Sequence, residues 1–591
     1  MLPLEEVPNL VALFFSRAAA KGDAPFLWHK ADGRWQSLSW AETADRVASL
    51  AAALKALGLA RGDRVMLVSE NRPEWCIADL AIMAAGGVTV PTYTSNTERD
   101  HAHIAENSGA RMAIVSTAKL AGALLPALAR SSACDTLVAI EPLTRGQTGP
   151  VAIHGWDELI AAHAPDIAAT AAAAAFAPDD LACIIYTSGT GGAPRGVMQH
   201  HGAILHNVAA CMAIIREDFP PGDEVFLSLL PLSHAYEHSG GQFLPIGLGA
   251  EIYYAESLEK LAANIEEVRP TIMIVVPRLF ELLRQRILKA VEKEGGLARW
   301  LLARAMAIGA RERPRLIDRP IDLVLSATLR PKIAQRFGGR MKALVSGGAP
   351  LNPEVGQFFS DLGLTLLQGY GQTEAAPVIS CNRPRTGIRL STVGTPLDAV
   401  AVRIAGDGEI MVKGPNVMHG YWRNEAETAR VLHEGWLATG DIGHLDEAGR
   451  IVITDRKKDL IVNDKGENVA PQRIEGMLTL QPEIAQAMAA GDRRPYLVAL
   501  IVPDAEWAAE WAKARGIDPA AAPAHQDFHR ALMAAVDRVN ATLSVTEKVR
   551  RILIADEPFA IANGELTPSL KVRRHVVRAR YGERLDALYG R

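Results

Sequence analysis

Short apolar runs alternate with helical patterns along most of this chain, and this alternation constrains the fold more than any other feature. Residues 41–60 repeat apolar positions three and four apart, which predicts an amphipathic helix. Residues 65–68 read as a buried strand, 75–85 as a helix, and 86–90 as a turn followed by a strand. The same alternation returns after residue 180. It predicts an α/β fold of doubly wound βα sheets with mainly parallel strands.

Length and composition indicate a globular protein of more than one domain. At about 150 residues per domain, 591 residues correspond to about four domains' worth of chain. Hydrophobic residues make up 49% and charged residues 22%, which excludes a disordered or collagen-like chain. The formal charge is only −4, so the balance gives no reason to expect nucleic acid as a partner.

Cysteine spacing and the N-terminus both point to the cytoplasm. The five cysteines form no CxxC pair, which argues against a zinc site or a disulfide framework and fits a reducing compartment. The chain begins MLPLEE, with acidic residues where a signal peptide needs basic ones. No run of about 18 apolar residues occurs, so we expect no transmembrane helix. The cysteines are Cys76, Cys134, Cys183, Cys211 and Cys381.

Two stretches suggest connections between structural units. Residues 161–177 are rich in alanine but contain Pro165, which favours a surface connector over a packed helix. Residues 455–459 form a dense charge cluster between two apolar, strand-like runs, as at an exposed domain boundary. We therefore predict a large domain over residues 1–457 and a small one over 458–591.

A basic segment leaves two interpretations open. Residues 311–342 contain nine basic and three acidic side chains. A solvated surface would explain this bias. Attraction to anionic lipid headgroups, as a peripheral contact on the inner face of a membrane, would also explain it.

A glycine-rich loop follows the apolar run that ends at residue 185. Residues 186–196 read YTSGTGGAPRG, with four glycines and three small hydroxyl side chains. Glycines let backbone N–H groups turn toward an anion, and Arg195 adds a fixed positive charge for phosphate oxygens. A tight turn would also suit the glycines, and no Gly-Lys-Ser/Thr ends the loop, so it is not a Walker A loop. The predicted phosphate residues are Thr187, Ser188, Gly189, Thr190, Gly191, Gly192 and Arg195.

The loop resembles the signature Thr-Ser-Gly-Thr-Thr-Gly-x-Pro-Lys-Gly of the adenylate-forming (AMP-binding) enzymes: acyl-CoA synthetases, luciferases and nonribosomal adenylation domains. Two positions depart from it. Gly191 replaces a threonine and so removes a phosphate hydroxyl, and Arg195 replaces a lysine, which turns a point charge into a planar fork. The resemblance implies a large N-terminal domain of βα sheets with a barrel-like subdomain, and a small mobile α+β C-terminal lid domain.

Further motifs in the order of that family implicate a nucleotide site. In QGYGQTE, Tyr370 offers a face for adenine, and Glu374 offers a hard oxygen ligand for Mg²⁺. By resemblance, Thr373 reaches the α-phosphate, and Thr187 is a possible second metal ligand. The turn SGGAPL after an apolar run resembles the adenine-binding turn, although a purely structural turn would also explain it. The nucleotide residues implied here are Gly347, Gly348, Ala349, Gln368, Gly369, Tyr370, Gly371 and Thr373.

Three more side chains are implicated by the resemblance. His234 in PLSHAYEH matches the position beside the bound carboxylate, although a lone histidine is usually structural. Asp441 can accept hydrogen bonds from both ribose hydroxyls, and Arg456 would add a charged donor to the same sugar. His238 remains unassigned.

The C-terminal motifs resemble the hinge and lid of the family. Lys458 falls at the hinge position and Gly466 at a position against the pantetheine arm of coenzyme A. Lys571, in LTPSLK, falls at the catalytic lysine, although without the motif a surface lysine in a basic tail would be the default interpretation.

The resemblance extends from about residue 10 to about residue 575, and residues 256–283 and 412–418 look like the long-chain fatty acyl-CoA synthetases. It implies a ligase that uses ATP, Mg²⁺ and coenzyme A in two steps: a fatty carboxylate forms acyl-AMP with release of pyrophosphate, and coenzyme A then takes the acyl group. The implied catalytic residues are Thr187, His234, Glu374 and Lys571.

Two alternatives remain open at this stage. A ligase of the same superfamily could hand acyl-AMP to a carrier protein instead of coenzyme A. The changes at Gly191 and Arg195 also raise a non-catalytic module that binds nucleotide or acyl-AMP. Chain-length preference, the pocket walls beyond a guess at 234–238 and 368–370, and the oligomeric state are not predicted.

Overall fold

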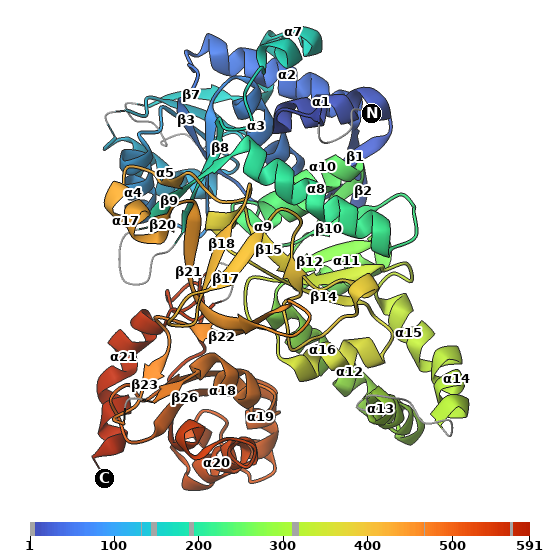
Figure 1. Cartoon of the computed structure of the whole chain (residues 1–591), viewed down its shortest axis with the longest axis vertical. Coiled ribbons are helices and arrows are strands. Elements are labelled where there is room, and N and C mark those ends of the chain that lie inside the picture. The colour runs from blue at the N-terminus through green and yellow to red at the C-terminus, as the bar shows by residue number, and fades with distance from the viewer. Residues whose placement is uncertain are drawn as a thin grey trace.

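The computed structural model describes residues 6–131, 133–143, 151–187, 194–309, 318–465, 467–567 and 571–590. Three sheets precede residue 457, and two small sheets follow it in a separate lobe, below the large one in Figure 1. We refer to the part after residue 457 as the C-terminal lobe. The arrangement confirms the predicted α/β class with a large N-terminal and a smaller C-terminal domain.

One large sheet has eight strands in the order β19-β9-β8-β4-β3-β5-β6-β7. Strands β8 to β7 in that order are parallel, whereas β9 and β19 are antiparallel additions at one edge. The strands are β3 (Arg64–Val68), β4 (Val88–Thr92), β5 (Met112–Val115), β6 (Thr136–Ala139), β7 (Ala152–Gly155), β8 (Leu181–Thr187), β9 (Arg195–His200) and β19 (Gly420–Tyr421).

The second large sheet has nine strands in the order β16-β15-β14-β13-β12-β10-β11-β1-β2. Its six central strands are parallel, and antiparallel strands close both edges. The strands are β1 (Pro25–Ala31), β2 (Arg34–Ser39), β10 (Val225–Ser228), β11 (Glu251–Tyr254), β12 (Ile272–Val275), β13 (Ala343–Ser346), β14 (Leu366–Gly371), β15 (Val378–Cys381) and β16 (Thr395–Pro396).

Helices cover both faces of each large sheet, since the connections between parallel strands pack helices against the faces of the sheet. The largest core draws buried side chains from both sheets and from the helices between them. Those helices are α1 (Leu10–Lys21), α2 (Trp40–Ala56), α3 (Pro73–Ala84), α8 (His201–Asp218) and α10 (Leu244–Leu248). The outer faces carry α4 (Glu98–Ser108) and α5 (Ala118–Leu128) on one sheet, and α11 (Leu261–Val268), α12 (Pro277–Glu294), α13 (Gly296–Gly309), α14 (Arg319–Ala327), α15 (Leu329–Arg336) and α16 (Pro353–Asp361) on the other.

A five-stranded antiparallel sheet follows the nine-stranded one, where the resemblance implies a barrel-like subdomain. It pairs β17-β18-β21-β20, with β22 on β21. Its elements are β17 (Ala401–Ile404), β18 (Glu409–Lys413), helix α17 (Glu425–Val431), β20 (Leu432–His433), β21 (Trp436–Leu445) and β22 (Ile451–Arg456).

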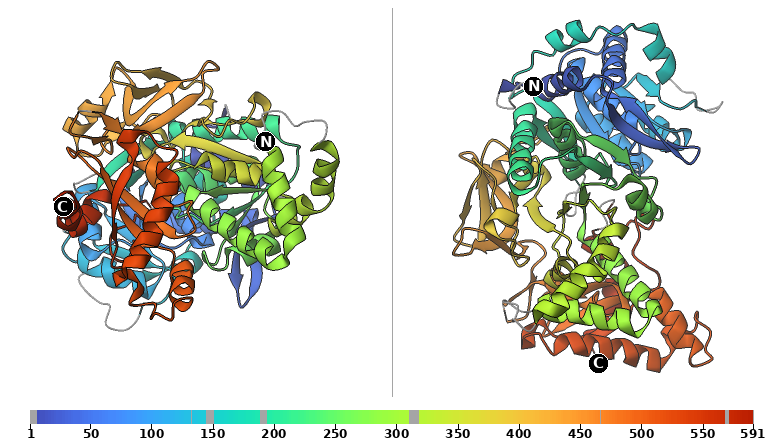
Figure 2. Two further views of the ribbon diagram at one scale, coloured as in Figure 1. Left: turned by 90° about the horizontal axis from the view of Figure 1, so that it is seen from below. Right: turned by 90° about the vertical axis from the view of Figure 1, so that its right-hand side faces the viewer.

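The C-terminal lobe is a small α+β unit with its own cores. It contacts the large part through the Lys289–Glu506 ion pair, which joins α12 to α19, and Figure 2 shows the lobe beside the α12–α16 helices. Its elements are β23 (Ile461–Val462), β24 (Asn468–Val469), α18 (Pro471–Leu478), β25 (Ile484–Ala490), β26 (Leu497–Pro503), α19 (Ala505–Lys513), α20 (Gln526–Asn540), β27 (Val549–Ile554) and α21 (Arg574–Asp586).

Sequence patterns predicted the first elements well. The helix expected over 41–60 is α2, and the expected strand, helix and strand that follow are β3, α3 and β4. The alanine-rich stretch contains a short helix, α7 (Ile167–Ala173), which has no buried residue. That helix agrees with a surface connector.

The basic segment carries less free charge than its composition suggests. Residues 311–317 lie outside the described residues. Further along, Arg330 pairs with Asp322, Lys342 pairs with Glu224, and Arg340 donates to the Val268 and Arg269 carbonyls. Within the described residues, no helix is both long and apolar enough to cross a membrane.

Candidate active site

One cleft of about 2450 Å³ collects the predicted site residues. It is bordered by strands of both large sheets, by the five-stranded sheet and by the C-terminal lobe. Residues 188–193 and Gly466 lie outside the described residues, so their predicted roles are carried only by the sequence. The predicted residues that line the cleft are Thr187, Arg195, His234, Gly347, Gly348, Ala349, Gln368, Gly369, Tyr370, Gly371, Thr373, Glu374, Asp441, Arg456, Lys458 and Lys571.

The two ends of the glycine-rich loop are held together by a β-hairpin. Thr187 is the last residue of β8 and pairs with Arg195, the first residue of β9. The Arg195 guanidinium lies 4.6 Å from the centroid of the Tyr421 ring and forms an ion pair with Glu427. Because the guanidinium stacks on a ring and pairs with a carboxylate, its planar fork is oriented in a way that a lysine could not be.

Glu374 lies in a short 3₁₀ helix, Thr373–Ala375, which is separated from the end of β14 by one residue. The Tyr421 hydroxyl donates to Glu374 Oε1 across 2.8 Å, and the Gln199 side chain donates to the Thr373 carbonyl across 2.7 Å. Thr187 and Glu374 line the same cleft, so hard oxygen donors from two segments are available there. That donor set fits Mg²⁺, which binds proteins through one or two such groups together with substrate phosphates.

Asp441 connects two predicted nucleotide residues. Tyr370 donates its hydroxyl hydrogen bond to Asp441 Oδ2 at 2.7 Å, and Arg456 Nε donates to Oδ1 at 3.2 Å. Asp441 and Arg456 are cross-strand partners on β21 and β22, so the sheet register fixes their contact. Asp441 is 5% exposed, so its carboxylate is largely shielded from water. Arg456 balances the charge of this carboxylate inside the protein.

At Gly347 and Gly371 only glycine fits, because other groups of the protein approach the backbone closely. A Cβ at Gly347 would lie 2.8 Å from the Tyr236 ring, whose hydroxyl donates to the Val345 carbonyl at 3.0 Å. A Cβ at Gly371 would lie 2.0 Å from the Pro377 carbonyl oxygen. The Tyr236 ring thus packs against the 346–349 turn, and Gly347, Gly348 and Ala349 of this turn also line the cleft.

His234 enters the cleft as a neutral imidazole. Burial, reinforced by the nearby Lys571 charge, lowers the pKa of His234 to about 3. Its Nδ1 accepts from the Tyr236 N–H at 3.1 Å, so the ring proton resides on Nε2 and can be donated. His238, four residues on, instead donates to Asp79 at 2.9 Å with both side chains fully buried, and it is a structural residue.

Lys571 reaches the cleft from the C-terminal lobe. Burial and the Arg456 charge lower the pKa of Lys571 to about 8, and Asp441 and Glu374 act in the opposite direction. The pKa of Lys458 is also lowered, again by burial and then by Arg456. Several cations therefore converge where the resemblance places the phosphates, and their mutual repulsion favours the binding of a polyanion.

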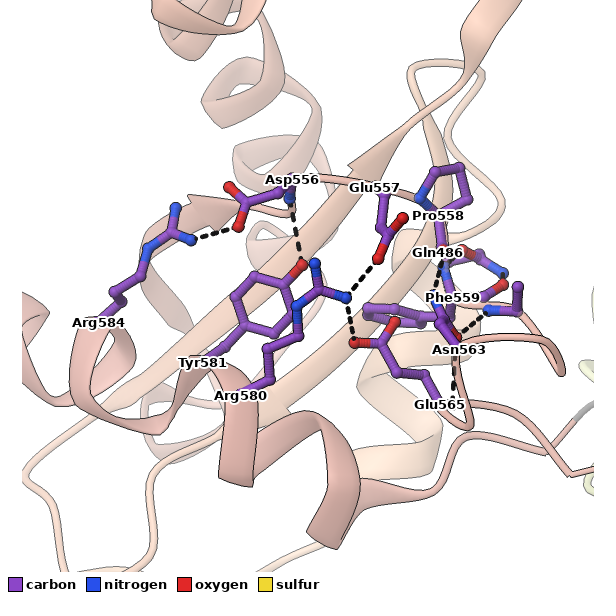
Figure 3. Close-up of polar contacts among 11 residues, drawn as sticks. Gln486, Asp556, Glu557, Pro558, Phe559, Asn563, Glu565, Arg580, Tyr581 and Arg584 are labelled. Atoms are coloured by element: carbon purple, nitrogen blue, oxygen red, sulfur yellow. Dashed lines mark hydrogen bonds and ion pairs between the residues drawn. The ribbon is translucent and has the colours of Figure 1, made fainter. Parts of the chain in front are cut away.

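A polar network supports the segment that leads to Lys571 (Figure 3). Arg580 on α21 pairs with Glu557 at 2.5 Å and Glu565 at 3.3 Å, and Arg584 pairs with Asp556 at 2.7 Å. The Glu565 carbonyl then accepts from the Arg573 N–H at 2.8 Å. The strand-like bridge of residues 566 and 572 continues from this network to Lys571.

Sequence reasoning missed an apolar wall of the same cleft. The wall comes from α8, the helical segment His238–Phe243 and the central strands of the nine-stranded sheet, which read in the sequence as ordinary core. Gly240 is required at this wall, because a Cβ there would lie 2.4 Å from Ile274 Cδ1. The apolar lining residues are Cys211, Ile214, Ile215, Phe219, Leu244, Ile272, Ile274, Ala343, Val345 and Leu367.

The chain matches two family profiles and many curated relatives. The profile of the AMP-binding enzyme matches residues 14–422, and that of the AMP-binding enzyme C-terminal domain matches residues 458–591. The long-chain-fatty-acid–CoA ligase FadD15 of Mycobacterium tuberculosis is 32% identical over 99% of this chain and 98% of its own. Human long-chain-fatty-acid–CoA ligase 6 is 30% identical over 99% of this chain and 87% of its own.

Solved structures share the fold at lower identity. The adenylation domain of a carboxylate reductase from Mycobacterium chelonae superimposes with a TM-score of 0.79 at 22% identity, covering 99% of this chain and 91% of that one. The corresponding domain from Segniliparus rugosus, in complex with AMP and a co-purified carboxylic acid, has a TM-score of 0.78 at 22% identity, covering 99% and 94%. The chain therefore belongs to the AMP-binding, adenylate-forming enzyme family, among the long-chain acyl-CoA synthetases.

Proposed function

We propose that this protein is an ATP-dependent fatty acid–CoA ligase. The carboxylate oxygen of a fatty acid attacks the α-phosphorus of ATP, and the bond to pyrophosphate breaks to leave acyl-AMP. The coenzyme A sulfur then attacks the acyl carbon, and AMP leaves. The observation that carries the proposal is that Glu374, Asp441 and Lys571, from three distant segments, line one cleft.

The physical problem of the first step is the approach of a carboxylate to a polyanion. Lys571 would bridge the carboxylate and the α-phosphate, and the 187–196 hairpin would hold the pyrophosphate end. His234, neutral and protonated at Nε2, would donate to a carboxylate oxygen. Glu374, with Thr187, would hold Mg²⁺, which when bound with ATP supplies further neutralisation of phosphate oxygens.

We propose that Asp441 and Arg456 orient the ribose, and that the 347–349 turn and Tyr370 hold the adenine. Asp441 Oδ1 and Oδ2 each receive one protein donor, and each retains a lone pair for a ribose hydroxyl. This geometry supports the ribose role. Tyr370, whose hydroxyl is held by Asp441, has its ring fixed in the cleft.

We propose that Lys571, which lines the cleft, leaves it before the thiol of coenzyme A enters for the second step. We propose that residues 1–457 and 458–591 are separate domains and that the C-terminal one rotates about Lys458, so that Gly466 can face the pantetheine arm of coenzyme A. The lobe has its own cores, and Lys458 lies two residues after the end of β22 and lines the cleft. Both features are expected of a lid on a hinge.

The apolar wall supports a long acyl chain as the substrate. It runs from α8 across β12 and β13 beside His234 and Gly347. Each methylene buried there would contribute about 0.8 kcal/mol, so affinity should rise with chain length until the wall ends.

We also propose that the enzyme is cytoplasmic and contacts anionic membranes through α13 and α14. All five cysteines are unpaired, as in a reducing compartment. Leu297 and Trp300 on α13 are 73% and 50% exposed, and Leu323 on α14 is 71% exposed. Arg319 and Lys332 are exposed nearby, so apolar side chains and positive charge occur together, as at a lipid surface. Salt-sensitive cosedimentation with anionic vesicles, weakened by Trp300→Ala with Leu323→Ser, tests this contact.

The activity is tested by AMP release across carboxylates of increasing length. The assay should be run without an acceptor, with coenzyme A, and with an acyl carrier protein. The proposal predicts turnover that rises with chain length and requires coenzyme A. Turnover with the carrier protein alone would indicate the other ligase class, and ATP binding without AMP release for any carboxylate would indicate a non-catalytic module.

A further inference from the structure

Two histidines and an aspartate form a cluster outside the cleft. One ligand atom each from Asp179, His200 and His419 lies within 4.8 Å of the other two. His419 Nε2 lies 2.9 Å from Asp179 Oδ1, and the two imidazole rings stack with centroids 4.4 Å apart and planes at 14°. None of the three residues lines the cleft, so the nucleotide chemistry does not account for them.

The edge of the eight-stranded sheet brings these residues together. His200 ends β9, and its register partner on β8 is Leu181, two residues after Asp179. His419 directly precedes β19, which pairs with β9. Asp179 and His419 are 240 residues apart in sequence, so no short sequence motif predicts that they lie together. His200 lies in a strand of this sheet, and Asp179 and His419 lie two residues and one residue before strands of the same sheet, so the sheet supports all three positions.

The donor atoms suit a transition-metal dication. Zn²⁺ binds imidazole nitrogen and carboxylate oxygen at about 2.0–2.2 Å, so ligand atoms in a tetrahedral site lie roughly 3.3 Å apart. The Asp179–His419 pair already approaches that separation. The Asp179 side chain is 88% exposed and can adjust without disturbing a core.

The remaining contacts of His200 allow the required tautomer. His200 Nδ1 lies 3.1 Å from the Pro178 carbonyl oxygen, so a proton on Nδ1 can be donated there and leave the Nε2 lone pair free. The other tautomer caps α8 by accepting from the Ala203 N–H at 3.2 Å and donates Nε2–H to the Val417 carbonyl at 3.3 Å. Metal binding would select the first tautomer and replace the cap.

We propose that Asp179, His200 and His419 bind a transition-metal dication such as Zn²⁺ in a structural role. The bound ion would tie β9 to β19 and to the segment before β8. Gln199, next to His200, donates to the Thr373 carbonyl, and Tyr421, two residues after His419, donates to Glu374. The ion would therefore stiffen the corner of the sheet that supports these two residues. The cysteine spacing argued against a zinc site, but the site proposed here uses histidine and carboxylate ligands, to which that spacing does not apply.

Titration of the full-length protein with Zn²⁺ and Co²⁺ tests the proposal independently of ligase activity. Calorimetry should detect one Zn²⁺ per chain, Co²⁺ should give the visible absorption of a nitrogen- and oxygen-ligated ion, and Zn²⁺ should raise the Tm. His419→Ala and Asp179→Asn should each weaken binding at least about tenfold and abolish the Tm shift. Both positions are solvent-accessible, so both variants should fold.

Two matched variants identify the site. Glu374→Gln removes the proposed magnesium ligand, and His433→Ala removes an exposed histidine elsewhere; both should bind Zn²⁺ like the wild type. The proposal is overturned if the wild type binds no Zn²⁺, if the cluster variants bind it unchanged, or if Glu374→Gln rather than the cluster variants abolishes binding.

Discussion

Tyr370 and Asp441 are joined by a buried hydrogen bond of 2.7 Å between the end of β14 and the middle of β21. The contact connects the nine-stranded sheet to the five-stranded sheet across the cleft. Since Arg456 holds the other oxygen of the same carboxylate, the proposed adenine and ribose residues are fixed relative to each other before a nucleotide arrives.

Tyr370→Phe should weaken ATP binding more than it slows turnover. The variant keeps the ring and removes one hydrogen bond to a charged group. Such a bond typically contributes about 1.5–3 kcal/mol of stabilisation. We expect KM for ATP to rise about tenfold or more, with KM for the fatty acid unchanged. Steady-state kinetics with each substrate varied checks this, and an equal rise in both KM values would contradict the assignment.

Lys571→Ala should separate the two half-reactions. The loss of a transition-state donor should slow acyl-AMP formation about 10²–10³-fold, whereas thioester formation from supplied acyl-AMP should be nearly unaffected. Rapid-quench measurement of each step checks this. Lys458→Pro is the matched control, because it should spare pyrophosphate release and block thioester formation. If Lys571→Ala slowed both steps equally, a lid with two positions would be excluded.

The first step should lose rate in alkaline solution. The pKa of Lys571 is lowered to about 8 by burial and by Arg456, and only the protonated amine can neutralise the reacting anions. As the pH rises through about 8 the free enzyme loses this charge, so kcat/KM for adenylation should fall above that pH. Measurement of kcat/KM for adenylation between about pH 6.5 and 9.5 tests this fall. Lys571→Arg should keep its charge at higher pH, so the fall in kcat/KM should move to higher pH. If the fall stayed at the same pH, it would be caused by a group other than Lys571.

Tyr421→Phe should raise the Mg²⁺ requirement. The hydroxyl orients Glu374, and loss of such an outer partner typically weakens metal binding about tenfold or more. The remaining ring still stacks under Arg195. The Mg²⁺ dependence of AMP release at saturating ATP measures the effect. Tyr421→Leu, which also removes the ring, should in addition raise KM for ATP. If the two variants behaved identically, the hydroxyl would have no role separate from that of the ring.

Local signals in the sequence predicted the fold class well. Apolar periodicity was enough for α2, which in the structure begins with a capping box formed by Ser39 and Glu42. The strands β3 and β4 are buried on both faces and read as continuous apolar runs, as parallel strands do.

Contacts between distant segments could not be predicted from the sequence. The pairing of Arg195 with Glu427 and the hydroxyl of Tyr421 on Glu374 depend on β19 joining the edge of the eight-stranded sheet. The acyl wall had no signal of its own, because Ile214 and Ile274 are spaced as core residues and only the tertiary structure leaves space beside them. The His200–His419 stack was hidden for the same reason.

We propose that side chains from distant segments act on one magnesium nucleotide. Fatty-acid-dependent isotope exchange between pyrophosphate and ATP, measured without coenzyme A, tests it most directly. We expect exchange in the wild type that requires both Mg²⁺ and a long-chain carboxylate, and a loss of about 10²-fold or more in each of Glu374→Gln, Asp441→Ala and Lys571→Ala. Wild-type exchange that persists in all three variants, or no exchange with any carboxylate, would contradict it.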